Sequence, residues 1–200
     1  MIDHLRDPAN AITAFGIGLS ATALIHVMAG RPEIATSFGL WAMIADQLDG
    51  IVARRTGKRN EAAAVIGKSL DGFGDLIYGA ILPAMLLLAA TGDELAVYPV
   101  AIGMIATGAL RLSYFSAFGL KEGSFIGLPL SYDLPVLAAL FLMRPFLEPL
   151  PFTLLLTAAC TTLAILHVAP VKIPAPDRVG YAAIILSAFG LSVALLFLAL

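Results

Sequence analysis

Four aspartates lie within two apolar stretches of the sequence that are long enough to cross a membrane. Asp46 and Asp49 are three residues apart, and Asp71 and Asp75 are four apart, so each pair lies on one face of a helix. A charged side chain at membrane depth costs at least about 2.5–3.5 kcal/mol, so four of them there require a function. Facing helices would bring the carboxylates together, and a hard divalent cation such as Mg²⁺ or Mn²⁺ would offset their repulsion. The sequence therefore predicts a metal site of the kind that supports reactions at phosphates.

Small residues share the helix faces of these carboxylates. Gly50 and Ala53 lie on the face of the first pair, and Gly67 lies on the face of the second. They leave open volume beside the carboxylates, as a bound ligand would require. Arg54 lies beside the same face, and its forked guanidinium suits a phosphate oxygen. Ordinary helix-end charges paired with basic neighbours would explain neither the spacing nor the glycines.

The composition assigns these residues to a membrane protein. Of the 200 residues, 60% are hydrophobic and 13% are charged, and the mean hydropathy is +0.92. Soluble domains are about 45–50% apolar and about 25% charged. The net charge of −2 provides no basic surface for nucleic acid. The single cysteine, Cys160, can form no disulfide within the chain.

Seven apolar runs have the length of membrane-spanning helices, about 20 residues each. They cover approximately residues 10–29, 35–53, 62–90, 95–117, 130–147, 151–168 and 179–200. The fifth run is the weakest, because Pro129, Pro135 and Asp133 interrupt it, so six or eight helices are also possible. We expect an all-α, multi-pass transmembrane bundle with short loops, formed as a single domain by residues 1–200.

The basic residues are distributed unevenly between the two ends of these runs. With a cytoplasmic N-terminus, all of the 12 lysines and arginines except Arg31 and Arg144 lie on the inner side. Because positive charge is enriched in cytoplasmic loops, we expect the N-terminus to lie in the cytoplasm. We expect an integral protein of the cytoplasmic (inner) membrane, with the aspartates facing the cytoplasm.

The segment from Asp46 to Asp75 resembles the signature of the CDP-alcohol phosphatidyltransferase family. The family pattern is D-x2-D-G-x2-A-R, a spacer, and then G-x3-D-x3-D, and all of its fixed positions are present in residues 46–75. The family's spacer is usually about eight or nine residues long, whereas residues 55–66 form a spacer of twelve. About one extra helical turn must therefore be accommodated, and we expect this at the cytoplasmic hairpin, in residues 56–60.

Shorter matches favour the phosphatidylserine synthase branch of this family. Residues 125–129, with the sequence Phe-Ile-Gly-Leu-Pro, resemble that branch's F-x-G-L-P segment. Pro83 lies eight residues after Asp75, as in that branch. Residues 8–13 are similar to the family's Pro-Asn-x-x-Thr start of the first helix, with one residue extra.

The resemblance implies transfer of a phosphatidyl group from CDP-diacylglycerol to the hydroxyl of a small alcohol, with release of CMP. It implies that the four aspartates bind two divalent metal ions, Mg²⁺ or Mn²⁺. It also implies that Asp75 is the general base toward the acceptor hydroxyl. Gly50, Ala53 and Gly67 match positions that line the cytidine site, and Arg54 matches the arginine near the diphosphate. A homodimer surrounded by membrane lipids is a further implication.

Arg111 is the first candidate for the acceptor site, because an arginine inside a membrane span is costly unless it has a function. Lys68, Ser131, Tyr132 and Asp133 lie on the same side of the membrane and could shape the acceptor pocket. Asp133 and Arg111 together could bind a zwitterion, which favours L-serine. Glycerol phosphate and inositol phosphate are the alternative acceptors.

Two other expectations concern alternative roles. The carboxylates could instead form the ion site of a divalent-cation transporter, although Gly50, Ala53 and Arg54 have no evident role in conducting a cation. His26 and His167 have no carboxylate partner in the sequence, so we expect both histidines to be packing or interfacial residues.

Overall fold

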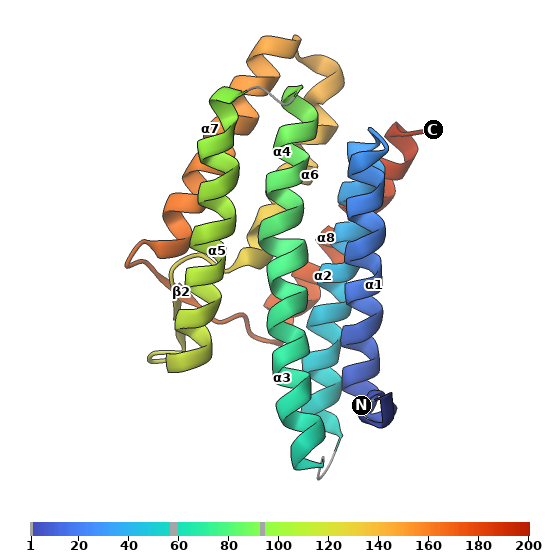
Figure 1. The fold of residues 1–200 in the computed structure, drawn as a ribbon, viewed down its shortest axis with the longest axis vertical. Helices are drawn as coiled ribbons and strands as arrows, with labels where there is room; N and C mark the ends of the chain where they lie inside the picture. Colours follow the sequence, from blue (N-terminus) through green and yellow to red (C-terminus); the bar gives the residue numbers. More distant parts are fainter. Residues whose placement is uncertain (1, 57–59, 93–94) are drawn as a thin grey trace.

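The computed structural model describes residues 2–56, 60–92 and 95–200. Within these ranges the chain forms seven long or medium helical stretches and one two-stranded β-ribbon (Figure 1). The prediction that the extra spacer residues are accommodated at the hairpin falls partly on residues 57–59, among them Lys58 and Arg59, which lie outside the described residues.

The first two helices form an antiparallel pair that begins at marked positions in the sequence. Helix α1 (Pro8–Met28) has proline in its first turn, and the Asp7 carboxylate accepts hydrogen bonds from the backbone of Ala9 and Asn10 at 3.1 and 3.2 Å. Helix α2 (Pro32–Arg55) also starts at a proline and follows a tight turn at Gly30, whose φ is 71°. Both features fix where the two helices start.

The third apolar run forms one continuous helix of 31 residues with an irregular turn inside it. Helix α3 (Glu61–Leu76) is capped by Asn60, whose side-chain oxygen accepts from the Ala62 amide at 2.9 Å. A π-helical turn, η2 (Ile77–Ile81), follows, and α4 (Leu82–Thr91) completes the crossing. The π-helical turn begins two residues after Asp75, just beyond the end of the predicted signature region.

The second half of the chain adds four helices and the ribbon. A short 3₁₀ turn, η3 (Leu95–Val97), leads into α5 (Tyr98–Phe118), and β1 (Ser124–Ile126) and the 3₁₀ turn η4 (Leu130–Tyr132) precede α6 (Asp133–Met143). After the 3₁₀ turn η5 (Arg144–Phe146), α7 (Pro149–Val168) leads to β2 (Lys172–Pro174) and α8 (Arg178–Leu198). The ribbon pairs β1 with β2 antiparallel, with Phe125 opposite Ile173.

The predicted transmembrane bundle is confirmed, with two differences in its helices. Five helical stretches are long and apolar enough to cross a membrane, and they correspond to the first, third, fourth, sixth and seventh predicted runs. Helix α2 is long enough but carries the aspartates and arginines of the signature. Helix α6 has 11 residues, about 16 Å of helix, because the prolines and Asp133 limit the regular part of the fifth run. The ribbon was not predicted.

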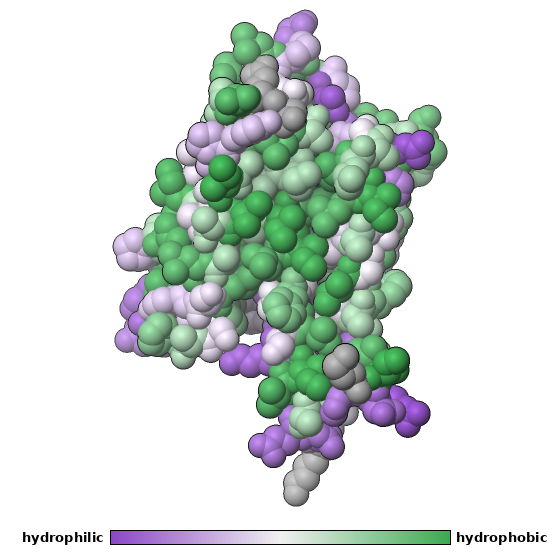
Figure 2. Space-filling model, viewed as in Figure 1, coloured by the Kyte–Doolittle hydropathy of each residue, from purple (hydrophilic) through white to green (hydrophobic). Residues whose placement is uncertain are grey.

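The core lies around α2, which packs between α1 and α8. Close approach requires Gly39, where an added Cβ would lie 2.5 Å from the Leu82 side chain. The two termini lie at opposite ends of the bundle (Figure 1), as an odd number of crossings requires. On the face drawn in Figure 2, apolar residues cover the middle and hydrophilic residues gather at the two ends. This arrangement places the second half of α2 and the end of α3 around one cavity with residues of the ribbon and η4.

Candidate functional site

Three of the four predicted aspartates form a cluster between α2 and α3. Asp46, Asp49 and Asp71 each offer a carboxylate oxygen, and these oxygens all lie within 4.8 Å of one another. Among the described residues, no lysine or arginine forms an ion pair with Asp46 or Asp71. Clustered carboxylate oxygens are the donors that Mg²⁺ and Mn²⁺ prefer. The cluster therefore fits the predicted metal site.

Helix α1 supports this cluster through two polar residues three positions apart. The Thr13 hydroxyl donates to Asp49 Oδ2 and lies 3.0 Å from the Ala9 carbonyl oxygen. The Asn10 amide donates to the Ala63 carbonyl at 2.9 Å and so links α1 to α3. The sequence matched residues 8–13 to the start of a helix, but it assigned these two side chains no role. Neither contact could be predicted from helical periodicity, because Thr13 and Asp49 are 36 residues apart and Asn10 and Ala63 are 53 residues apart.

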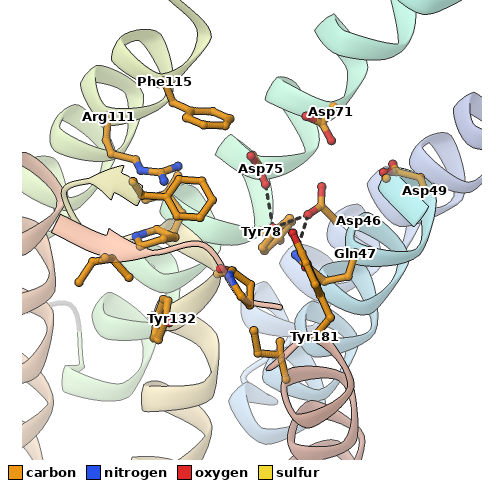
Figure 3. A pocket seen from close by; sticks show the side chains of 18 of the residues that line it. Asp46, Gln47, Asp49, Asp71, Asp75, Tyr78, Arg111, Phe115, Tyr132 and Tyr181 are labelled. Carbon is orange, nitrogen blue, oxygen red and sulfur yellow. Dashed lines mark hydrogen bonds between the residues drawn. The ribbon is translucent and has the colours of Figure 1, made fainter. Parts of the chain in front are cut away.

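The fourth aspartate, Asp75, lies outside the three-carboxylate cluster and is held by a tyrosine. The Tyr78 hydroxyl lies 2.7 Å from Asp75 Oδ1 and 3.1 Å from Asp46 Oδ2. The tyrosine side chain is buried, with 2% of its surface exposed. Asp75 lies between the cluster and Arg111 in the view of Figure 3. Tyr78 was not among the predicted site residues, although its position three residues after Asp75 shares a helix face with that aspartate.

One cavity of about 260 Å³ has the aspartates on one side and a cation on the other. We call the first side the acidic wall, which consists of Asp46, Asp49, Asp71 and Asp75. We call the opposite side the basic wall, which consists of Arg111, Phe115, Phe125, Ser131 and Tyr132. Figure 3 shows the labelled aspartates facing Arg111 across this space. The cavity thus combines metal-ligand chemistry with a fixed positive charge.

Arg111 is the centre of the basic wall. Its guanidinium carbon lies 5.4 Å from the ring centre of Phe115 and 5.3 Å from that of Phe125, so cation–π contacts with these two adjacent rings hold it in place. Only 6% of the residue is exposed, and its Nε is buried without a hydrogen-bond partner among the described residues. Phe125 reaches this position because β1 pairs with β2. Such a desolvated, rigid guanidinium is suited to a carboxylate or phosphate.

A second cavity of about 240 Å³ lies on the other side of the cluster. It shares Asp49, Gly50 and Asp71 with the first cavity, and Ala53 and Gly67 also line it. The structure therefore brings together the three small residues that were predicted to line the nucleotide site. Arg54 lines the first cavity instead, and its guanidinium carbon lies 5.8 Å above the Tyr181 ring.

The predicted acceptor residues divide into two groups. Arg111, Ser131 and Tyr132 line the first cavity. Lys68 lines the second cavity instead, and its Nζ donates to the Ser116 carbonyl oxygen at 3.3 Å. Asp133 does not line the first cavity either, because its side chain is completely buried. The structure therefore does not bring Lys68 and Asp133 into contact with the space where an acceptor fits.

His167 is buried, as a packing residue would be, but the structure gives it a carboxylate partner that the sequence did not indicate. His167 Nε2 lies 3.0 Å from Asp133 Oδ1, and both side chains are completely buried. The Thr107 hydroxyl lies 3.4 Å from the other ring nitrogen, Nδ1. The pair forms because the start of α6 lies beside the end of α7, and these positions are 34 residues apart in the chain. His26, by contrast, stacks on Phe38 with ring centres 5.3 Å apart, as a packing residue would.

Comparisons with known proteins agree with this geometry. The sequence model described as CDP-alcohol phosphatidyltransferase matches residues 7–200. The chain is 29% identical over 157 residues to an archaetidylserine synthase of Methanothermobacter thermautotrophicus, covering 76% of this chain and 62% of that protein. It is 36% identical over 110 residues to a CDP-diacylglycerol–serine O-phosphatidyltransferase of Methanocaldococcus jannaschii, covering 54% of this chain and 51% of that protein. The match thus spans between half and two thirds of the length of these curated relatives.

Proposed function

The chain belongs to the CDP-alcohol phosphatidyltransferase family, and we propose that it transfers a phosphatidyl-type group from a CDP-linked lipid to L-serine. The acceptor oxygen forms a bond to the phosphorus that carries the lipid, and the bond from that phosphorus to CMP breaks. The hydroxyl proton goes to Asp75. The observation that carries this proposal is the single cavity in which the acidic wall faces Arg111. Both relatives described above are named for transfer to serine.

The acidic wall would hold the divalent ions of the reaction. Asp46, Asp49 and Asp71 supply the clustered oxygens, and we assign two ions, Mg²⁺ or Mn²⁺, with Asp75 contributing to the second. When bound, such ions offset charge on the diphosphate and stabilise CMP as a leaving group. Thr13 and Tyr78 hold the ligands in place from outside the cluster.

Asp75 is the proposed general base. Its Oδ1 is occupied by the Tyr78 hydroxyl, and its Oδ2 forms no hydrogen bond with the described residues. Asp75 also lines the first cavity, so Oδ2 is the oxygen available to accept the proton of the acceptor hydroxyl. A positioned carboxylate of this kind contributes about 10²–10⁴-fold to a proton-transfer step.

Arg111 is the proposed ligand of the acceptor's carboxylate. Among the described residues that line the cavity, Arg54 and Arg111 carry positive charge, and we assign Arg54 to the diphosphate. A single remaining guanidinium matches the one carboxylate of serine through two parallel hydrogen bonds. Glycerol phosphate or inositol phosphate would bring about two negative charges, so the charge of the cavity favours serine.

The nucleotide would occupy the second cavity, where Gly50, Ala53 and Gly67 leave room for close approach. We place the N-terminus and both cavities on the cytoplasmic side of the inner membrane, and we propose a homodimer among membrane lipids. Arg54 and Arg55 at the end of α2 support this orientation. The transporter alternative is not favoured, because the chain belongs to a transferase family.

Release of CMP by the purified protein tests this function. The donors are CDP-diacylglycerol and its archaetidyl counterpart, since the names of the two relatives differ in the lipid. The acceptors are L-serine, glycerol 3-phosphate, inositol and inositol phosphate, with Mg²⁺ or Mn²⁺ present. We expect metal-dependent release with serine, and its loss in Asp75→Asn. Release only with a phosphorylated acceptor would overturn the assignment of serine, and a flux of divalent cations into liposomes without any release would favour transport.

A further inference from the structure

A π-helical turn lies inside the helix that carries Asp71 and Asp75. Regular α-helical hydrogen bonding ends at Leu76, and Ile77–Ile81 form the wider π-helical turn. Such turns are rare and are frequently found at functional sites. On one side, Gly79 allows η4 to approach, because an added Cβ would lie 2.7 Å from Leu130 Cβ. The neighbouring residue, Tyr78, fills the interior beside α1 and α2, where it borders Gly16 and Ala42.

The Tyr78 hydroxyl lies between carboxylates from two different helices. It is 2.7 Å from Asp75 Oδ1 on α3 and 3.1 Å from Asp46 Oδ2 on α2. A phenol carries one proton and can donate it to one acceptor at a time. The hydroxyl thus links a member of the three-carboxylate cluster to the aspartate that stands outside it (Figure 3).

Packing alone does not explain a tyrosine at this position. A phenylalanine would fill the same volume, and a buried hydroxyl costs free energy unless it is hydrogen bonded. Because only 2% of the Tyr78 surface is exposed, its hydroxyl depends on protein acceptors. Both of its acceptors belong to the acidic wall.

We propose that Tyr78 is a positioning residue for the acidic wall. It orients Asp46 as a metal ligand and holds Asp75 apart from the three-carboxylate cluster, so that Asp75 Oδ2 remains directed to the acceptor. This role rests on the function proposed above, but its effect on metal binding can be measured without either substrate.

The test is the affinity of the purified protein for Mn²⁺, measured by electron paramagnetic resonance without lipid donor or serine. Loss of an outer-shell partner typically costs about 10–100-fold in metal affinity or activity, so we expect Tyr78→Phe to raise the Kd for Mn²⁺ about tenfold or more. The matched control is Tyr114→Phe, which removes a tyrosine hydroxyl that accepts a hydrogen bond from Lys121 Nζ at 2.6 Å. Tyr114 does not line the first cavity. We expect the control to stay within about twofold of the unmodified protein.

A second comparison separates positioning from a general loss of stability. Once Asp46→Asn has removed the ligand charge, Tyr78→Phe is expected to weaken Mn²⁺ binding by less than it does alone, since contacting residues are not additive. On the same samples, Tm is measured with and without Mn²⁺. The rise in Tm is taken relative to the metal-free form of each variant, so a variant that is less stable overall can still be assessed for Mn²⁺ binding. In turnover, Tyr78→Phe is expected to lower kcat about 10–100-fold at saturating Mn²⁺, with the KM for serine nearly unchanged.

Two results would overturn the role of Tyr78. One is a Kd for Mn²⁺ and a kcat that stay within about twofold of the unmodified protein. The other is an equal loss of Mn²⁺ affinity with and without Asp46→Asn. Failure of the proposed transferase reaction is distinguishable from both, because it would abolish CMP release with every acceptor while the Mn²⁺ comparison remained measurable.

Discussion

The acidic wall and the basic wall of the cavity differ in how their charges are held. Hydroxyl groups hold the acidic wall: Thr13 donates to Asp49, and Tyr78 lies between Asp46 and Asp75. Two adjacent aromatic rings, those of Phe115 and Phe125, hold Arg111 in the basic wall. Hydroxyl donors fix the direction of a carboxylate oxygen, whereas aromatic faces exclude water and leave the guanidinium donors available. The first arrangement suits metal ligands and a base, and the second suits capture of an anionic group.

The walls also differ in their origin along the chain. All four aspartates lie within residues 46–75, on neighbouring helices. The residues of the basic wall come from three elements, α5, β1 and η4. Strand β1 is in turn held by pairing with β2, which begins only at Lys172. The comparison predicts that changes in the acidic wall lower kcat or metal affinity, whereas changes in the basic wall raise the KM for serine.

The largest loss is expected from Asp75→Asn. An amide cannot accept the proton of the acceptor hydroxyl, so kcat should fall about 10²–10⁴-fold. Asp75 does not belong to the three-carboxylate cluster of Asp46, Asp49 and Asp71. Asp75→Asn should therefore change the Kd for Mn²⁺ less than a substitution of one of those three residues does. Single-turnover release of CMP measures the effect. A kcat within tenfold of the unmodified protein would show that another group takes the proton.

The second loss is expected from Asp71→Asn, which removes a ligand of the cluster. The Kd for Mn²⁺ should rise by at least the 10–100-fold that loss of an outer-shell partner costs. Activity should therefore recover in part at high Mn²⁺, unlike that of Asp75→Asn. Titration of CMP release with Mn²⁺ checks this difference. Identical Mn²⁺ titrations for the two variants would remove the distinction between ligand and base within the acidic wall.

Much of the acidic wall could be predicted from sequence because helical periodicity is local. Spacings of three and four residues place Asp46 beside Asp49 and Asp71 beside Asp75 on their own helices. The hydroxyls that hold them were missed, because Thr13 and Tyr78 lie in apolar helices where similar residues usually pack. The contacts Thr13–Asp49 and Tyr78–Asp46 cross 36 and 32 residues, a distance at which periodicity carries no information. The contact of Tyr78 with Asp75 crosses three residues, so periodicity could have indicated that one.

The basic wall shows the limit of the same reasoning. Arg111 was a candidate because a charge inside an apolar run is conspicuous, and it does line the cavity. Asp133 was chosen on the same ground, yet its partner is His167 and not a substrate. A lone charge indicates that a partner exists but does not identify it. The three-residue strands β1 and β2, which fix Phe125, are too short for an alternating pattern to predict.

The third prediction concerns Arg111 and the acceptor. A hydrogen bond to a charged group contributes about 1.5–3 kcal/mol, and 1.4 kcal/mol corresponds to about tenfold in affinity. Arg111→Met should therefore raise the KM for serine about 10–100-fold, with a smaller change in kcat. Arg111→Lys keeps the charge but loses the fork, so its KM should lie between those of the other two proteins. Initial rates across serine concentrations measure this. An unchanged KM combined with a large fall in kcat would instead place Arg111 at the diphosphate.

The smallest effect on turnover is expected from the buried Asp133–His167 pair, which lies behind the basic wall. Asp133→Asn retains an acceptor for the hydrogen bond to His167, whereas Asp133→Leu removes the partner of His167 Nε2. Loss of a partner from a buried polar group costs about 1–3 kcal/mol, so Asp133→Leu should lower the free energy of unfolding by that amount and Asp133→Asn by less. Thermal unfolding in detergent compares the two, with His26→Phe as the control because His26 stacks on an aromatic ring. Equal stability of the two Asp133 variants would mean that the hydrogen bond contributes little. A rise in the KM for serine as large as that of Arg111→Met would mean that Asp133 orients the guanidinium directly.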